Sequence, residues 1–90
     1  MVWRVELDPA AERELAKLDQ SVARRILKFL HDRVAILDDP RSIGQALKGS
    51  RLGEFWKHRV GDYRVISHIE DSALRVLVIR IAHRRKVYRR

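Results

Sequence analysis

Apolar and polar residues alternate at the start of the chain and again through its second half. Trp3, Val5 and Leu7 fall on one parity, so residues 2–7 are predicted to form a half-buried strand. The same period of two recurs after residue 54. It predicts three further strands, at Phe55–Val60, Tyr63–Glu70 and Leu74–Ala82.

Between these strands the hydrophobic period lengthens to that of a helix. Asp8 is a good N-cap, and it predicts a first helix from Pro9 to Leu18. A second helix is predicted from Gln20 to Leu37, capped by Asp19 or Ser21. Its apolar stripe consists of Val22, Ile26, Phe29, Leu30, Val34 and Leu37.

The order of these elements predicts an α+β domain. Residues 39–54 hold three glycines and few apolar anchors, so they are predicted to form a loop. Gly61 and Asp62 fit a two-residue hairpin turn. The strand at Leu74–Ala82 is apolar on both sides and should be central. We therefore expect one domain, residues 1–90, in which an N-terminal strand and a two-helix hairpin pack on an antiparallel sheet.

Composition narrows the class of protein. With 90 residues, 46% of them hydrophobic, the chain can build one small core. It contains no cysteine, which excludes disulfides and thiol chemistry. No apolar run approaches the roughly 20 residues of a membrane span, and no secretory signal is expected at the N-terminus. These features agree with a cytoplasmic protein.

Charge is distributed unevenly along the chain. The formal net charge is +8, from 20 basic and 12 acidic residues. Residues 1–46 carry 8 of each sign, and residues 47–90 carry 12 basic and 4 acidic residues. The whole excess lies in the second half, which predicts a polyanionic partner such as nucleic acid. The alternative is a solvated surface whose charge serves solubility.

The predicted hairpin brings three cations onto one face of the sheet. A two-residue turn at 61–62 places Arg59 opposite Arg64, and Lys57 shares their face. Like charges directly opposite each other are destabilising, and such a local conflict often marks a functional site. Phosphate is the natural ligand for this triplet. The alternative is that the long side chains simply extend into solvent.

A basic tail follows the last predicted strand. Aromatic side chains among arginines suit single-stranded nucleic acid, because the ring stacks on a base while the cations hold the backbone. The alternatives are that Tyr88 packs into the core and that the arginines form a disordered basic end. The tail residues are His83, Arg84, Arg85, Lys86, Tyr88, Arg89 and Arg90.

The four histidines differ in their predicted roles. His31 should lie on the surface, and His58 alternates away from the cationic face and should be structural. His68 shares the parity of Arg64, and His83 is the one histidine considered for a site. No metal-binding histidine spacing and no glycine-rich phosphate loop occur, so we expect neither a metal nor a cofactor.

Taken together, these segments resemble a known family. Three stretches carry the resemblance, namely 8–18 (DPAAERELAKL), 52–66 (LGEFWKHRVGDYRVI) and 78–89 (VIRIAHRRKVYR). In this order and spacing they resemble the RelE/ParE toxin superfamily, and within it the RelE branch. The resemblance covers nearly the whole chain and implies a RelE-like fold whose sheet has a basic, concave face.

The resemblance also implies a function. RelE-like toxins of bacterial toxin–antitoxin pairs enter the ribosomal A site and cut mRNA there, by attack of a ribose 2′-hydroxyl on the adjacent phosphate. Arg64 would then neutralise the scissile phosphate, Arg84 would serve the leaving oxygen, and Tyr88 would stack on a base. The catalytic positions matched in this sequence are Lys57, Arg59, Arg64, Arg84 and Tyr88, and further RNA contacts are expected from Lys48, His83, Arg85 and Lys86.

The general base is the open point in this scheme. Neighbouring cations favour the neutral form of a lysine, which makes Lys57 a plausible base. Arg59 stands where several relatives have lysine, and arginine is a poor base because it stays protonated. His83 is the other candidate acid or base.

The resemblance implies partners and leaves alternatives. A cognate antitoxin should mask the basic face with an acidic, amphipathic segment, and operator DNA would be bound only through that antitoxin. The ribosome and mRNA would be the targets, and no membrane is involved. The alternatives are a ParE-like inhibitor of DNA gyrase, a non-catalytic nucleic-acid-binding module, and an inactive toxin copy.

Overall fold

The computed structural model describes residues 3–47 and 55–83 of the chain. The described strands are β1 (Arg4–Leu7), β2 (Gln45–Ala46), β3 (Phe55–Val60), β4 (Tyr63–Glu70) and β5 (Arg75–His83). The helices are α1 (Pro9–Ala16) and α2 (Gln20–Phe29), with a π-helical turn at Leu30–Val34 and 3-10 turns at Pro40–Ile43 and Asp71–Ala73. The predicted bounds of β3 and β4 are confirmed, and those of β1 and β5 are shifted by one or two residues.

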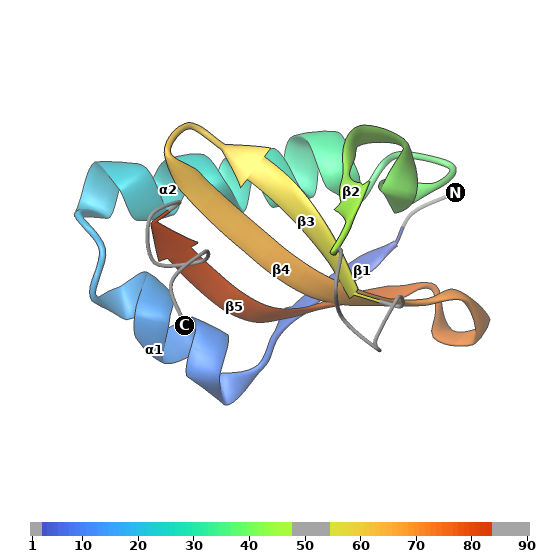
Figure 1. The fold of residues 1–90 in the computed structure, drawn as a ribbon, viewed down its shortest axis with the longest axis horizontal. Helices are drawn as coiled ribbons and strands as arrows, with labels where there is room; N and C mark the ends of the chain where they lie inside the picture. Colours follow the sequence, from blue (N-terminus) through green and yellow to red (C-terminus); the bar gives the residue numbers. More distant parts are fainter. Residues whose placement is uncertain (1–2, 48–54, 84–90) are drawn as a thin grey trace.

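Over the described residues, the sheet has five strands in the order β1-β5-β4-β3-β2, so β5 is an interior strand as predicted. Its β3–β4–β5 part is an antiparallel meander, whereas β1 pairs with β5 in parallel. Both helices pack on the sheet, with α1 beside β5 and α2 beside β3 (Figure 1). The α+β class is therefore confirmed. None of the described helices is long and apolar enough to cross a bilayer.

The core lies between α2 and one face of the sheet, which we call the helix face. Ile26, Leu30 and Val34 are fully buried and belong to one apolar cluster with strand residues such as Val65 and Val78. The spacing of these helix residues is the one that the apolar stripe predicted. We call the opposite side of the sheet the distal face.

The β3–β4 hairpin has the predicted register. Val60 pairs with Tyr63 and Arg59 with Arg64 across the turn at Gly61 and Asp62. Gly61 has φ = +60°, which a hairpin turn requires and which costs little only for glycine. The turn chemistry thus fixes which side chains of β3 and β4 share a face.

An irregularity in β5 changes which of its residues are buried. Ile66 pairs with Arg80 and Ser67 with Val78, so Ile79 is an extra residue that forms a β-bulge. Because of the bulge, Ile81 is buried at 2% exposure, although simple alternation from Val78 would bury Arg80. The bulge therefore keeps the charged side chain of Arg80 out of the core.

The two helices end earlier than predicted. The first ends at Ala16 rather than Leu18, and the second ends at Phe29 instead of continuing to Leu37. Beyond Phe29 the chain widens into the π-helical turn, where the Ala35 amide donates to the Leu30 carbonyl. The Ala35 carbonyl accepts from the amide of Trp3, which ties the end of this segment to the N-terminal strand at 2.8 Å.

The predicted loop at 39–54 contains regular structure in its described part. Pro40–Ile43 is a 3-10 turn, capped by the Asp39 carboxylate, which accepts from the Arg41 amide at 3.0 Å. Gln45–Ala46 is the short strand β2, which pairs with Lys57 and Trp56 of β3. A two-residue strand has too short an alternation to be seen in the sequence.

Candidate nucleic-acid interface

Two arginines stand opposite each other on the distal face. Arg59 of β3 pairs with Arg64 of β4, and Lys57 lies two residues before Arg59 on the same parity. Directly opposed side chains have their Cβ atoms about 5 Å apart. The hairpin therefore places the Cβ atoms of Arg59 and Arg64 next to each other on the distal face, as the sequence predicted.

Arg64 is a buried cation. It is 7% exposed, and the residue that pairs with it on β5 is Ala82, which is also buried. Its Nη1 donates to the carbonyl of Tyr63 at 3.3 Å. Within residues 3–47 and 55–83, neither Arg64 nor Arg59 forms an ion pair with a carboxylate. A buried charge without a counter-ion is costly, so a bound anion would stabilise this arrangement.

The other end of the distal face shows the opposite arrangement. Arg75 of β5 donates from Nε and Nη2 to one oxygen of Glu70, at 2.9 and 2.6 Å, and from Nη1 to Glu6 at 3.0 Å. These hydrogen bonds, first those to Glu70 and then the one to Glu6, raise the pKa of Arg75. Here the sheet neutralises its own charge.

A second arginine is neutralised in the connection to β2. Arg41 donates to both carboxylate oxygens of Asp71, at 3.1 and 2.8 Å, and to Asp39 at 3.2 Å. The bond from Arg41 lowers the pKa of the Asp71 carboxyl. The guanidinium also lies 5.7 Å from the ring centre of Trp56, close enough for a cation–π contact. Arg41 therefore has a structural role, because it links the connection before β2 to the turn between β4 and β5.

His58 lies on the helix face, away from the arginines. It is fully buried, its Nε2 lies 2.9 Å from the Pro40 carbonyl, and its ring packs edge-on against Phe29. Burial lowers the pKa of His58, and the bond to Pro40 opposes this effect only in part. The neutral ring can donate to that carbonyl, so the prediction of a structural histidine is confirmed.

The remaining histidines have distinct environments. His31 is exposed, as predicted. His68 lies on the distal face, 3.5 Å from a carboxylate oxygen of Glu70, with its ring against Phe55. His83 ends β5 opposite Tyr63, and the two rings pack at right angles with centroids 5.4 Å apart.

Several predicted site residues lie outside the described residues. They are Lys48, Arg84, Arg85, Lys86 and Tyr88. Their roles therefore stay predictions. Over the described ranges, no cluster of three or more histidine or acidic residues has the geometry of a metal site.

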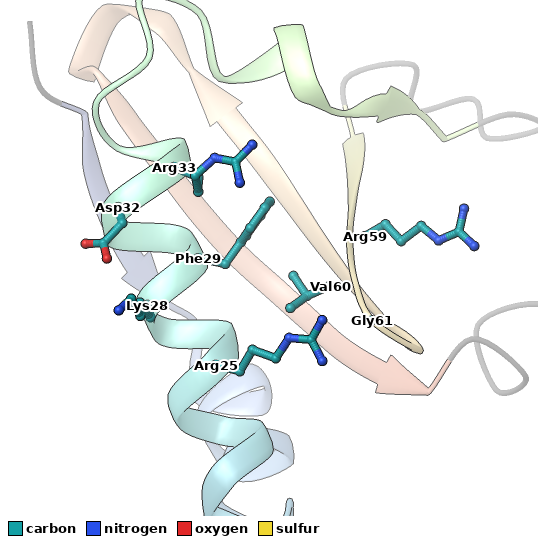
Figure 2. A pocket seen from close by; sticks show the side chains of 8 residues that line it. All are labelled: Arg25, Lys28, Phe29, Asp32, Arg33, Arg59, Val60 and Gly61. Atoms are coloured by element: carbon teal, nitrogen blue, oxygen red, sulfur yellow. The ribbon is translucent and has the colours of Figure 1, made fainter.

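Three further cations, which the sequence did not single out, lie on α2 and on the π-helical turn that follows it. Arg25 and Lys28 of α2 and Arg33 of the π-helical turn line a pocket beside the end of β3, with Phe29 among the lining residues (Figure 2). The first half of the chain has no net charge, which concealed them. The signal that could have revealed them is a run of basic residues on the polar side of a strongly amphipathic helix.

The arrangement of strands and helices is shared with solved toxins. The fold superimposes on the toxin–antitoxin complex RelBE2 from Mycobacterium tuberculosis with a TM-score of 0.82, at 24% identity, covering 92% of each chain. It matches the archaeal RelE–RelB complex from Pyrococcus horikoshii OT3 with a TM-score of 0.70, at 27% identity, over 93% of this chain and 97% of that one. The fold is that of the RelE-like toxins.

Sequence comparison supports the same conclusion. Residues 5–88 match the family described as the ParE toxin of the type II toxin–antitoxin system parDE. The toxin RelE of Mycobacterium tuberculosis is 32% identical over 97% of this chain and 87% of its own length, and the toxin RelG of that organism is 29% identical over the whole of both chains. The chain belongs to the ParE toxin family of type II toxin–antitoxin systems, within the RelE/ParE superfamily.

Proposed function

We propose that this toxin cleaves mRNA in the ribosomal A site, as a RelE-like endoribonuclease. The observation that carries the proposal is the pair formed by exposed Arg59 and buried Arg64, which have no carboxylate partner among the described residues. The other arginines in the described strands form ion pairs with acidic side chains. Two adjacent cations of this kind form a site for a phosphate group.

The main requirement of this reaction is stabilisation of the negative charge that develops on the phosphate. The ribose 2′-hydroxyl loses its proton and attacks the adjacent phosphorus, the bond from phosphorus to the 5′-oxygen breaks, and a cyclic phosphate remains. Negative charge on the phosphate oxygens increases in the transition state. The guanidinium of Arg64, fixed by its bond to the Tyr63 carbonyl, would stabilise that charge without reorganisation.

Few side chains near the arginine pair can accept or donate a proton in this reaction. Lys57 is two residues from Arg59 on the same face and is the candidate base. His83, the other candidate acid or base, pairs with Tyr63 at the end of β5 and therefore lies on the helix face, away from the arginines. Arg59 stays protonated and would bind rather than accept a proton. Arg84 and Tyr88 complete the proposed set, serving the leaving oxygen and a stacked base.

An antitoxin is the proposed protein partner. Solved relatives include the intact RelBE complex of Escherichia coli and its RelE toxin bound to the antitoxin peptide RelBc. A cognate antitoxin of this chain would neutralise the Arg59–Arg64 pair with acidic side chains, and operator DNA would be bound through the antitoxin. An mRNA target implies that the protein acts in the cytoplasm.

Primer extension on an mRNA bound to programmed 70S ribosomes tests the proposal. Arg64→Lys keeps the charge of the buried side chain and removes its planar fork, so we expect cleavage at the A-site codon to fall about 100-fold or more. The matched control is Arg4→Lys, an exposed arginine at the far end of the sheet, which should cleave like the natural protein. Circular dichroism would confirm that both variants fold.

The ribosome-free arm decides how specific the activity is. Cleavage of free mRNA at equal rate would remove the ribosome from the proposal, and no cleavage in either sample would disprove the nuclease. Because the family match is to a ParE toxin, a DNA gyrase inhibitor is the second candidate. Inhibition of gyrase supercoiling, without mRNA cleavage, would establish that function instead.

A further inference from the structure

A groove runs between α2 and the outer edge of β3, near the hairpin turn. Figure 2 shows Arg25 and Arg33 leaning from the helix toward the strand, whereas Lys28 and Asp32 point away from it. An added Cβ on Gly61 would lie 3.1 Å from Nη1 of Arg25, so this guanidinium rests on the turn. Arg25 therefore marks the turn end of the groove.

The strand side of the groove is a sheet edge that no strand of residues 3–47 or 55–83 covers at Arg59. The Phe55 carbonyl accepts from the Leu47 amide, which shows that odd-numbered residues of β3 direct their backbone groups away from β4. Strand β2 pairs only with Trp56 and Lys57. In the described part of the chain, the outward N–H and C=O of Arg59 consequently have no partner strand. The Arg59 side chain itself points away from α2 (Figure 2).

The floor of the groove is apolar and its ends are cationic. Phe29 and Val60 lie between the two arginines (Figure 2). Arg25 and Arg33 are eight residues apart, which corresponds to about 12 Å along a helix. In an extended chain, residues i and i+4 point to the same side and are about 13 Å apart. The groove thus matches an extended segment with acidic residues four positions apart and an apolar residue between them.

We propose that this groove is the docking site for an acidic, extended segment of the antitoxin, which adds to the edge of β3 at Arg59. The inference rests on the proposed antitoxin partner and names the surface that holds it. Two carboxylates would meet Arg25 and Arg33, the apolar side chain would contact Phe29, and backbone atoms would pair with Arg59. A peptide is favoured over RNA because a free strand edge and an apolar floor suit a polypeptide backbone.

The experiment uses synthetic peptides and the full-length toxin. The probe is a fluorescent peptide with a glutamate–threonine–valine–threonine–glutamate core, and the control peptide has the same composition with adjacent glutamates. Binding is followed by fluorescence anisotropy. We expect the spaced peptide to bind more tightly, and the Arg25→Glu/Arg33→Glu variant to weaken it by about tenfold or more. The Arg13→Glu/Arg24→Glu variant changes the net charge equally, outside the groove, and should have a much smaller effect.

Amide hydrogen exchange tests the strand addition itself. The peptide should slow exchange of the Arg59 amide, whereas the Val60 amide, which faces β4, serves as the internal reference. Equal binding of the two peptides, equal weakening by both double variants, or unchanged Arg59 exchange would each overturn the inference. Loss of ribosome-dependent cleavage in Arg25→Glu/Arg33→Glu, with peptide binding intact, would assign the groove to RNA.

The outcome is separable from that of the proposed function. Peptide binding does not require cleavage, so an inactive toxin that binds the spaced peptide would contradict only the nuclease. A cleaving toxin that ignores the peptide would contradict only the docking site.

Discussion

The two ends of the distal face treat positive charge in opposite ways. At the end near the β4–β5 connection, Arg75 lies between Glu6 and Glu70 and donates to both. At the end near the hairpin turn, Arg59 and Arg64 face each other, and no carboxylate among the described residues joins them. The first arrangement stabilises the fold, and the second costs stability. Charge count alone therefore does not distinguish the two ends, whereas the lack of compensation singles out the turn end as the candidate site.

The largest effect is expected when a carboxylate is introduced beside Arg64, so that the turn end of the distal face also contains an ion pair. Arg59→Glu would place a carboxylate opposite Arg64, and we expect ribosome-dependent cleavage to fall by about 100-fold or more. The same change should raise stability by about 0.2–1 kcal/mol, because an opposite-charge pair replaces a like-charge pair. Urea unfolding measures the second effect. Lower stability together with normal cleavage would contradict the contrast between the two ends.

A substitution at Gly44 tests whether the proposed site depends on the packing of the segment that contacts His58 on the helix face. In Gly44→Ala the new Cβ would lie 2.9 Å from Nε2 of buried His58. Because the ring is confined by Phe29 and by its bond to the Pro40 carbonyl, we expect a loss of about 1–3 kcal/mol in unfolding free energy. Per folded molecule, cleavage should be unchanged. Thermal unfolding and activity measured on one preparation would check both statements.

Glu14 provides a test at the edge of β5. Its two oxygens accept from the Ile81 amide at 2.7 Å and from Nε of Arg80 at 3.0 Å. Glu14→Ala leaves the amide without this acceptor, and we expect a loss of about 1 kcal/mol. Glu14→Gln keeps an acceptor for the amide and should cost less. If both variants lost the same amount, the ion pair with Arg80 would be the dominant contact.

The helix face supplies a pH test of the same hairpin. The pKa of His58 is lowered from 6.5 by burial, so the unfolded chain binds a proton more readily than the folded one. Its contribution to stability is complete above pH 6.5 and is lost as pH falls below that value. Urea midpoints over this range should decline in the natural protein and less steeply in His58→Gln. The exposed His31→Gln control should keep the full slope.

The smallest expected effect is at the compensated end. Arg75→Gln removes the cation that joins Glu6 and Glu70, so the midpoint of unfolding should fall slightly while cleavage stays unchanged. Added salt should narrow the difference between variant and natural protein, because it screens exposed ion pairs. A marked loss of cleavage in Arg75→Gln would extend the proposed site across the whole distal face.

Local sequence signals were sufficient for the hairpin and for the arginine pair. The alternation in β3 and β4, with glycine in a two-residue turn, fixed the register that places Arg59 opposite Arg64. The same parity assigned His58 to the other face. These predictions succeeded because a tight turn and a period of two determine facing residues without reference to the rest of the chain.

Other features depend on contacts between distant segments, and the sequence carried no local signal for them. The parallel pairing of β1 with β5 joins residues about 70 positions apart, from Arg4↔Arg75 to Leu7↔Val78. The bulge at Ile79 follows from the need to bury Ile81 and to send Arg80 toward Glu14. Each is chosen by the energy of the whole packed arrangement.

Periodicity, turn chemistry and motif order are local properties, so they were enough to predict the α+β class, the resemblance to RelE-like toxins and the opposed arginines. The packed fold was needed to show that Arg64 is buried, that Arg75 is paired with carboxylates, and that α2 and the edge of β3 enclose a groove. Burial and compensation depend on which distant side chains meet, and that is settled only when the helices and the sheet pack together.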